Sequence, residues 1–141
     1  MAVEYVKKSQ GEKAVVRLLV ADDHHIVRGG FVELLNLQPG FEVVGEAADG
    51  EQAIEQTESL HPDAIIMDVD MPNINGIEAT RRIKQRHPRT VVIGLSLYEE
   101  AAVGRAMGQA GANTYISKYA SPEDLVQAIR RACHCDGDPQ P

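Results

Sequence analysis

The chain has 141 residues, 43% of them hydrophobic, which is enough to bury a core in a single domain without disulfides. Its net charge of -7, with 14 Lys and Arg residues, argues against a surface for nucleic acid or anionic membrane. Phosphate binding needs a concentrated basic face. No apolar run approaches the roughly 20 residues of a membrane-spanning helix, and the start lacks the apolar core of a signal peptide. We therefore expect a cytoplasmic protein that contacts neither membrane nor nucleic acid through these residues.

The ends of the chain differ in composition from its middle. Residues 1–14 are polar and mixed in charge, and we expect a flexible extension there. Residues 135–141 carry no apolar pattern and are expected to be a loose tail or the start of a linker. Residues 15–134 remain as one folded domain.

The two cysteines lie close together near the end of the chain. Cys133 and Cys135 flank His134, a spacing too short to staple a fold. A metal site built from these three residues alone lacks a fourth ligand, so we do not expect one here.

The first half of the chain alternates strands with helices. A strand is predicted at 15–21 and ends in Asp22 and Asp23. The next helix places four apolar residues on one face at the helical period: Val27, Phe31, Leu34 and Leu35. A weaker strand follows at 42–47. In the helix after it, the residues predicted to face the core are Ala53, Ile54, Thr57 and Leu60.

An uninterrupted apolar run, Ala64 to Met67, leads directly into Asp68. Such a run without polar alternation is typical of a strand buried on both faces in a parallel sheet. Asp68 then lies at the carboxyl end of that strand, where open α/β sheets place their ligands. On its own, an aspartate at this point could equally cap the following helix through its side-chain oxygen.

The second half continues the alternation. A third helix is marked by Ile77, Thr80 and Ile83, and a strand at 90–95 follows. The helix predicted at 99–110 contains two interior glycines, each of which costs roughly 0.5–1 kcal/mol relative to alanine, so we expect it to be the least stable. A strand at 113–117 precedes a helix that opens with Ser121-Pro122-Glu123-Asp124. The buried stripe of that last helix is predicted to be Leu125, Ala128, Ile129 and Ala132.

This order of elements predicts the α/β class. Five strands joined by short helical connections form a doubly wound five-stranded parallel sheet with helices on both faces. Polar residues stand at the strand ends and should meet at one edge: Asp22, Asp23, Asp68, Ser96 and Lys118. Gathered carboxylates repel one another unless an acid is protonated or a cation is bound, and oxygen ligands suit Mg²⁺. Taken singly, Asp22 or Asp23 could cap a helix, and Lys118 could be a solvated loop residue.

These residues together resemble the receiver domain of two-component response regulators. The resemblance covers Val15 to Ala132 and is carried by LLVADDHHIVR, DVDMPNINGIEATRRI, the Leu95-Ser96 pair and GANTYISK with Lys118. The segments VADDHHIVRGG and GANTYISK are most similar to the NarL/FixJ (LuxR-like) branch, which joins a receiver to a C-terminal helix-turn-helix DNA-binding domain. The resemblance implies a flavodoxin-like fold with strand order 2-1-3-4-5.

The resemblance also implies a role for each site residue. Asp68 would accept a phosphoryl group from a histidine kinase or a small donor such as acetyl phosphate. Asp23, Asp68 and the main-chain carbonyl of Asp70 would bind Mg²⁺, and Asp22 would hold a metal-bound water. Lys118 would neutralise phosphoryl charge, Ser96 would turn to a phosphoryl oxygen, and Tyr115 would turn inward behind it.

Further expectations concern output and partners. The protein would be no dedicated enzyme, since it would only phosphorylate and dephosphorylate itself. Control of transcription would act through a DNA-binding domain outside these 141 residues. A homodimer would pair through the last helix with either the first helix or the fifth strand.

Three positions depart from the common receiver pattern. Leu97 is bulkier than the residue usual after Ser96, and Tyr119 stands where many receivers have proline, which leaves the geometry of the Lys118–Tyr119 peptide open. Asp70 adds a carboxylate near the site and could weaken the approach of anionic donors.

Three other readings compete. Asp68-Val69-Asp70 after an apolar strand resembles haloacid-dehalogenase-type phosphatases, but there the acidic pair lies downstream of the nucleophile, whereas Asp22 and Asp23 lie upstream. A flavodoxin-like flavin protein would need a hydroxyl- and glycine-rich phosphate loop after the first strand instead of two acids. A receiver-like module could also act by protein contact without phosphorylation.

Overall fold

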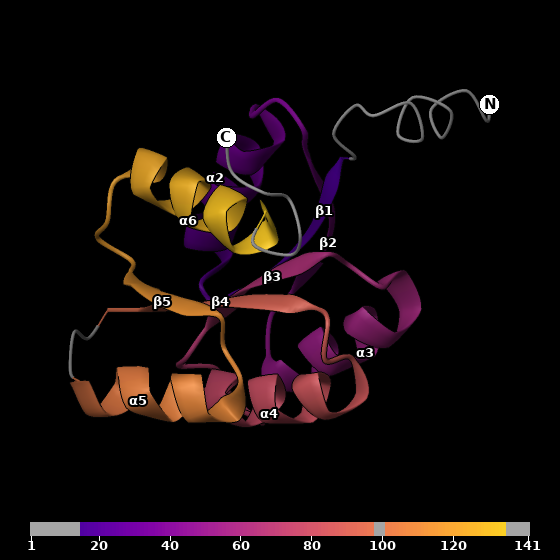
Figure 1. The fold of residues 1–141 in the computed structure, drawn as a ribbon, viewed down its shortest axis with the longest axis vertical. Helices are drawn as coiled ribbons and strands as arrows, with labels where there is room; N and C mark the ends of the chain where they lie inside the picture. The colour runs from indigo at the N-terminus through magenta and orange to yellow at the C-terminus, as the bar shows by residue number, and fades with distance from the viewer. Residues whose placement is uncertain (1–14, 98–100, 135–141) are drawn as a thin grey trace.

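A five-stranded parallel sheet stands between two layers of helices (Figure 1). The computed structural model describes residues 15–97 and 101–134. The strands are β1 (Val16–Ala21), β2 (Phe41–Ala47), β3 (Ala64–Asp68), β4 (Val91–Ser96) and β5 (Thr114–Ser117). They lie in the order β2-β1-β3-β4-β5, which confirms the predicted fold and places β3 at the centre.

Five helices connect and cover the strands. They are α2 (His25–Asn36), α3 (Gly50–Leu60), α4 (Gly76–Arg86), α5 (Ala101–Ala110) and α6 (Pro122–His134). Figure 1 shows α2 and α6 on one face of the sheet and α3, α4 and α5 on the other. None of the helices in the described ranges is long and apolar enough to cross a membrane.

The central strand β3 supplies side chains to both layers. Ile66 packs in one hydrophobic cluster with Leu35 of α2 and Ile129 of α6. Ile65 packs in a second cluster that includes Met107 of α5. All five residues of β3 are buried, because both faces are covered, and the apolar run in the sequence reflects this double burial.

One predicted core position is wrong. Val27 of α2 is 40% exposed, whereas Val32 packs partly buried against the core. The reason is the position of Val27 in the first turn of the helix. All three residues of this turn up to Val27 are exposed, namely His25, Ile26 and Val27, so the turn contributes nothing to the core.

The other predicted helices agree with the structure where it describes them. α6 begins as expected, with the backbone N–H of Asp124 donating to Ser121 Oγ at 3.1 Å. The helix predicted at 99–110 is observed from Ala101, and its first two residues lie outside the described ranges. The predicted flexible segments 1–14 and 135–141 lie outside them as well.

Candidate functional site

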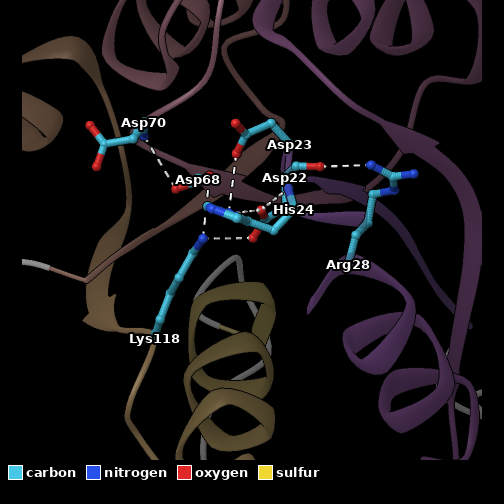
Figure 2. A network of polar contacts seen from close by, with 7 residues as sticks. All are labelled: Asp22, Asp23, His24, Arg28, Asp68, Asp70 and Lys118. Carbon is cyan, nitrogen blue, oxygen red and sulfur yellow. Dashed lines mark hydrogen bonds and ion pairs between the residues drawn. The ribbon is translucent and has the colours of Figure 1, made fainter. Parts of the chain in front are cut away.

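Three aspartates meet at the carboxyl edge of the sheet. Asp22 and Asp23 follow β1, and Asp68 ends β3, which pairs with β1 in parallel. Asp22 is 0% and Asp68 1% exposed, whereas Asp23 faces solvent in part. One oxygen of each of the three carboxylates and one ring nitrogen of His24 all lie within 4.8 Å of one another. The predicted convergence of the strand ends is therefore observed for these residues (Figure 2).

Lys118 is the cation of this cluster. It follows β5, and its side chain is 6% exposed. Its Nζ lies 2.8 Å from Asp22 Oδ2 and 3.3 Å from Asp68 Oδ2, so one ammonium is shared by two buried carboxylates (Figure 2). The reading of Lys118 as a solvated loop residue does not fit this burial.

Asp22 does not act as the cap of α2. The N-cap residue is His24, and no side chain caps the helix. Asp22 Oδ1 instead accepts a hydrogen bond from the backbone N–H of His24 at 2.8 Å, which closes the turn before the helix. The other oxygen, Oδ2, points to Lys118. The backbone between β1 and α2 therefore fixes the direction of this carboxylate.

The loop after Asp68 is tied down at two points. The backbone N–H of Asp70 donates to Asp68 Oδ1 at 3.2 Å, while the Asp70 side chain is exposed and points away from Lys118 (Figure 2). Further along, Asn73 has a φ of 66° and donates from Nδ2 to Asp49 Oδ2 at 2.8 Å. Asp49 is the N-cap of α3, so that helix anchors the loop carrying the Asp70 main chain.

Gly76 allows α4 to begin directly against the backbone of the site. A Cβ built on Gly76 would lie 2.0 Å from the main-chain oxygen of Asp68 and 2.9 Å from Val69 Cα. The Gly76 N–H also donates to the Val69 oxygen at 2.8 Å. Only a residue without a side chain permits this approach, which fixes the backbone on either side of the Asp68 side chain.

Ser96 and Tyr115 lie at the positions that the sequence predicts. Ser96 ends β4 and is fully buried, and its main-chain oxygen accepts a hydrogen bond from the Lys118 N–H at 2.8 Å. Tyr115 of β5 is partly buried between two glycines. A Cβ on Gly94 would lie 3.1 Å from Tyr115 Cδ1, and one on Gly104 of α5 would lie 3.3 Å from Cδ2. The ring therefore lies between β4 and α5, beside Met107 of α5, which also packs over Gly94.

Two contributors to the site escaped the sequence reasoning. His24 directs its Nδ1 at Asp22 Oδ1 and Asp23 Oδ1, at 3.1 and 3.2 Å. Arg28 is 15% exposed and bridges the Asp22 main chain to Glu46 of β2. In the sequence, the only sign of a role for His24 was its position next to the acidic pair. The direction of its side chain toward that pair depends on α2 beginning only at His25.

Leu97 and the Lys118–Tyr119 peptide are the remaining departures from the common receiver pattern. Within the described ranges no peptide bond is cis, so the Lys118–Tyr119 peptide is trans. Leu97 and Tyr119 are 41% and 78% exposed.

Burial has opposite electrostatic effects on the carboxylate and the ammonium. It raises the pKa of Asp68, the negative charge of Asp22 adds to this, and the opposing effects of Lys118 and the Asp70 N–H leave a pKa of about 7. Burial alone would lower the pKa of Lys118, but the two carboxylates outweigh it and raise that pKa above its ordinary value. Without a bound cation, Asp68 is therefore partly protonated near neutral pH.

This raised pKa predicts an unusual dependence of stability on pH. Between the ordinary value of 3.8 and about 7, folded Asp68 holds a proton that the unfolded chain has lost, so stability falls as pH rises through this window. At roughly 1.4 kcal/mol per pKa unit, the loss should amount to about 2–4 kcal/mol. Urea unfolding with EDTA at pH 5 and pH 8 measures it. In Asp68→Asn the loss should shrink by that amount, and equal losses in both proteins would contradict the assignment.

Comparison with known proteins supplies the context of this site. Residues 18–130 match the family described as response regulator receiver domain. The chain is 41% identical over 116 residues to response regulator GacA of Pseudomonas viridiflava and 40% identical over 117 residues to nitrate/nitrite response regulator protein NarL of Escherichia coli K12. Each alignment covers 82% of this chain, and 54% and 53% of those relatives. The chain thus spans about half their length.

A solved structure agrees with the sequence relatives. A two-component response regulator of the LuxR family from Aurantimonas sp. SI85-9A1 superposes with a TM-score of 0.83 at 35% identity, over 86% of this chain and 87% of that one. The family match and the acidic pair upstream of Asp68 both favour a receiver over the phosphatase and flavin-protein alternatives. The chain belongs to the receiver domain family of two-component response regulators, among its NarL-type and LuxR-type members.

Proposed function

We propose that this domain accepts a phosphoryl group on Asp68 and thereby controls an output. The observation that carries the proposal is the sharing of one buried ammonium, Lys118, between the carboxylates of Asp68 and Asp22, with Asp23 beside them. This arrangement presents a nucleophilic oxygen at a sheet edge and supplies positive charge where a phosphoryl group would arrive.

The charge of the cluster fits a divalent cation. Three carboxylates face a single ammonium, and the imbalance has to be relieved by protonation or by a cation. Carboxylate oxygens with space for water suit Mg²⁺. We assign the ion to Asp23, Asp68 and the Asp70 main-chain carbonyl, with Asp22 holding a bound water. When bound, Mg²⁺ would neutralise charge on the phosphoryl oxygens.

The transfer itself uses few protein groups. An oxygen of ionised Asp68 forms a bond to phosphorus as the bond from phosphorus to the donor breaks, and the electron pair leaves with the donor. The donor is a histidine kinase or a small molecule such as acetyl phosphate. Lys118 offsets charge that spreads over the equatorial oxygens. The product is an acyl phosphate on Asp68, and attack of water on its phosphorus would release inorganic phosphate and restore the carboxylate.

The response of the domain would involve Ser96, Tyr115 and α5. A phosphoryl group on Asp68 would recruit Ser96 and Lys118, and this difference in contacts would favour one of two existing conformations. Moving a population from mostly inactive to mostly active requires about 5 kcal/mol of such preference. Two relatives carry the names of a transcriptional regulatory protein and a nitrate/nitrite response regulator, which supports control of transcription through a separate DNA-binding domain.

Incubation with acetyl phosphate tests the proposal. With MgCl₂, intact mass spectrometry should show the gain of one phosphate, and the gain should fall strongly with EDTA. Hydroxylamine should remove it, because acyl phosphates react with this nucleophile. A phosphate that resists hydroxylamine, or no gain at all, would contradict the proposal. Continuous hydrolysis of p-nitrophenyl phosphate would favour the phosphatase reading instead.

A further inference from the structure

His24 lies within the group of potential cation ligands. Its Nδ1 is 3.1 Å from Asp22 Oδ1 and 3.2 Å from Asp23 Oδ1, and Figure 2 shows the imidazole directed at the acidic cluster. A single N–H on Nδ1 can point well at only one of these two oxygens. Nδ1 is thus close to an oxygen of both carboxylates at once.

The separations match those of neighbouring ligands on one metal ion. Imidazole nitrogen and carboxylate oxygen bind first-row transition ions at about 2.0–2.2 Å, and two ligands at right angles are then about 3 Å apart. The 3.2 Å between His24 Nδ1 and Oδ1 of Asp23, which we assign as a ligand of the ion, agrees with this separation. Mg²⁺ prefers oxygen and keeps several waters, whereas Ni²⁺ and Zn²⁺ accept imidazole readily.

The His24 side chain can either bind a cation at the site or turn away from it. Its side chain is 53% exposed, and although His24 is the N-cap of α2, no side-chain bond caps that helix. The neighbouring His25 is also exposed, but its Nδ1 lies 3.4 Å from Arg28 Nη2 and takes no part in the cluster. The two adjacent histidines therefore provide a matched pair.

We propose that His24 is a ligand that extends the cation site of this domain to nitrogen-accepting transition ions. Ni²⁺ would bind through Nδ1 of His24 together with the carboxylates, whereas Mg²⁺ would bind through oxygen alone with the imidazole turned aside. The inference depends on the proposed function only in that both use one cation site. His24 then sets which metals the site prefers.

Calorimetric titration of the whole chain with MgCl₂ or NiCl₂ tests this assignment. Both cysteines are first alkylated so that their thiols cannot bind nickel. His24→Ala should raise the Kd for Ni²⁺ by at least about tenfold. Removing a residue that only hydrogen-bonds to a metal ligand already weakens metal affinity by about 10–100-fold. The Kd for Mg²⁺ should stay unchanged, and His25→Ala should leave both values unchanged. Asp23→Asn should weaken both ions and thereby identify the site.

The outcomes separate this inference from the proposed function. Absence of Mg²⁺ binding by the wild-type chain would overturn the proposed cation site. Normal Mg²⁺ binding with a Ni²⁺ affinity that is the same in wild type and His24→Ala would overturn the role of His24 alone. An equal loss for both metals in His24→Ala would also overturn it, since the residue would then act on the fold of the loop. Circular dichroism of each variant checks the fold.

Discussion

Asp68→Asn should abolish the gain of phosphate from acetyl phosphate. The amide that replaces the carboxylate cannot form the acyl phosphate. The side chain of Asp70, which follows Asp68 in the same loop, points away from the cluster (Figure 2). Intact mass after incubation with Mg²⁺ measures the effect. The expected result is complete loss of the added phosphate.

The variant should keep its fold, which makes the loss interpretable. Replacing Asp68 by a neutral side chain of the same size removes repulsion from Asp22 and leaves the Asp22–Lys118 pair intact, so the metal-free variant should be at least as stable as the wild type at pH 8. Asp70→Asn is the matched control, because it changes an exposed carboxylate and leaves the main chain in place. It should still gain one phosphate. Labelling of Asp68→Asn to the wild-type extent would place the acceptor elsewhere.

Gly76→Ala should destabilise the protein by about 3 kcal/mol or more, at the upper end of the cost of overpacking. The added methyl group would lie 2.0 Å from the main-chain oxygen of Asp68, and every atom that it meets is backbone, which cannot turn aside as a side chain does. The start of α4 would have to move away from the strand end. Urea unfolding measures the loss, and a change below 1 kcal/mol would show that the helix can shift at little cost.

Gly108→Ala is the matched control for the helix itself. Gly108 lies in α5, and a Cβ built there meets nothing within 4 Å. Alanine is favoured over glycine in a helix interior by roughly 0.5–1 kcal/mol, so this variant should be more stable than the wild type. The opposite signs of the two substitutions would separate the clash at Gly76 from helix propensity, because propensity alone favours alanine at both positions.

The fold was predictable because, in most elements, the spacing of apolar residues in the sequence agrees with the side chains that are buried. The apolar run that ends at Asp68 has no alternation, and the strand is indeed covered on both faces. Val27 shows where this reasoning fails. Its spacing from Phe31 fits the buried face of α2, but the first turn of that helix is exposed, and a helical period does not show where along a helix burial begins. Among the described elements, the predicted and observed ends of each strand differ by one residue at most.

The sequence was sufficient to predict which residues form the site, but not how their side chains are buried and directed. Parallel strands bring their carboxyl ends together, so the meeting of Asp22, Asp68 and Lys118 follows from topology. Which of two adjacent aspartates is buried depends on the turn between β1 and α2, and here Asp22 is buried whereas Asp23 is partly exposed. The direction of His24 depends on the same turn. Contacts of this kind arise from tertiary packing and leave no periodic trace in the sequence.

The place of Tyr115 between Gly94 and Gly104 has a mechanical consequence. Because neither glycine has a side chain, the aromatic ring and Met107 together fill the volume between the sheet and this part of α5. Rotation of the ring away from this volume would create a void and forfeit the dispersion contacts of its walls unless the helix moved to fill it. Interiors tolerate such voids poorly, so ring orientation and helix position are expected to change together. Any displacement of α5 would therefore require Tyr115 to repack as well.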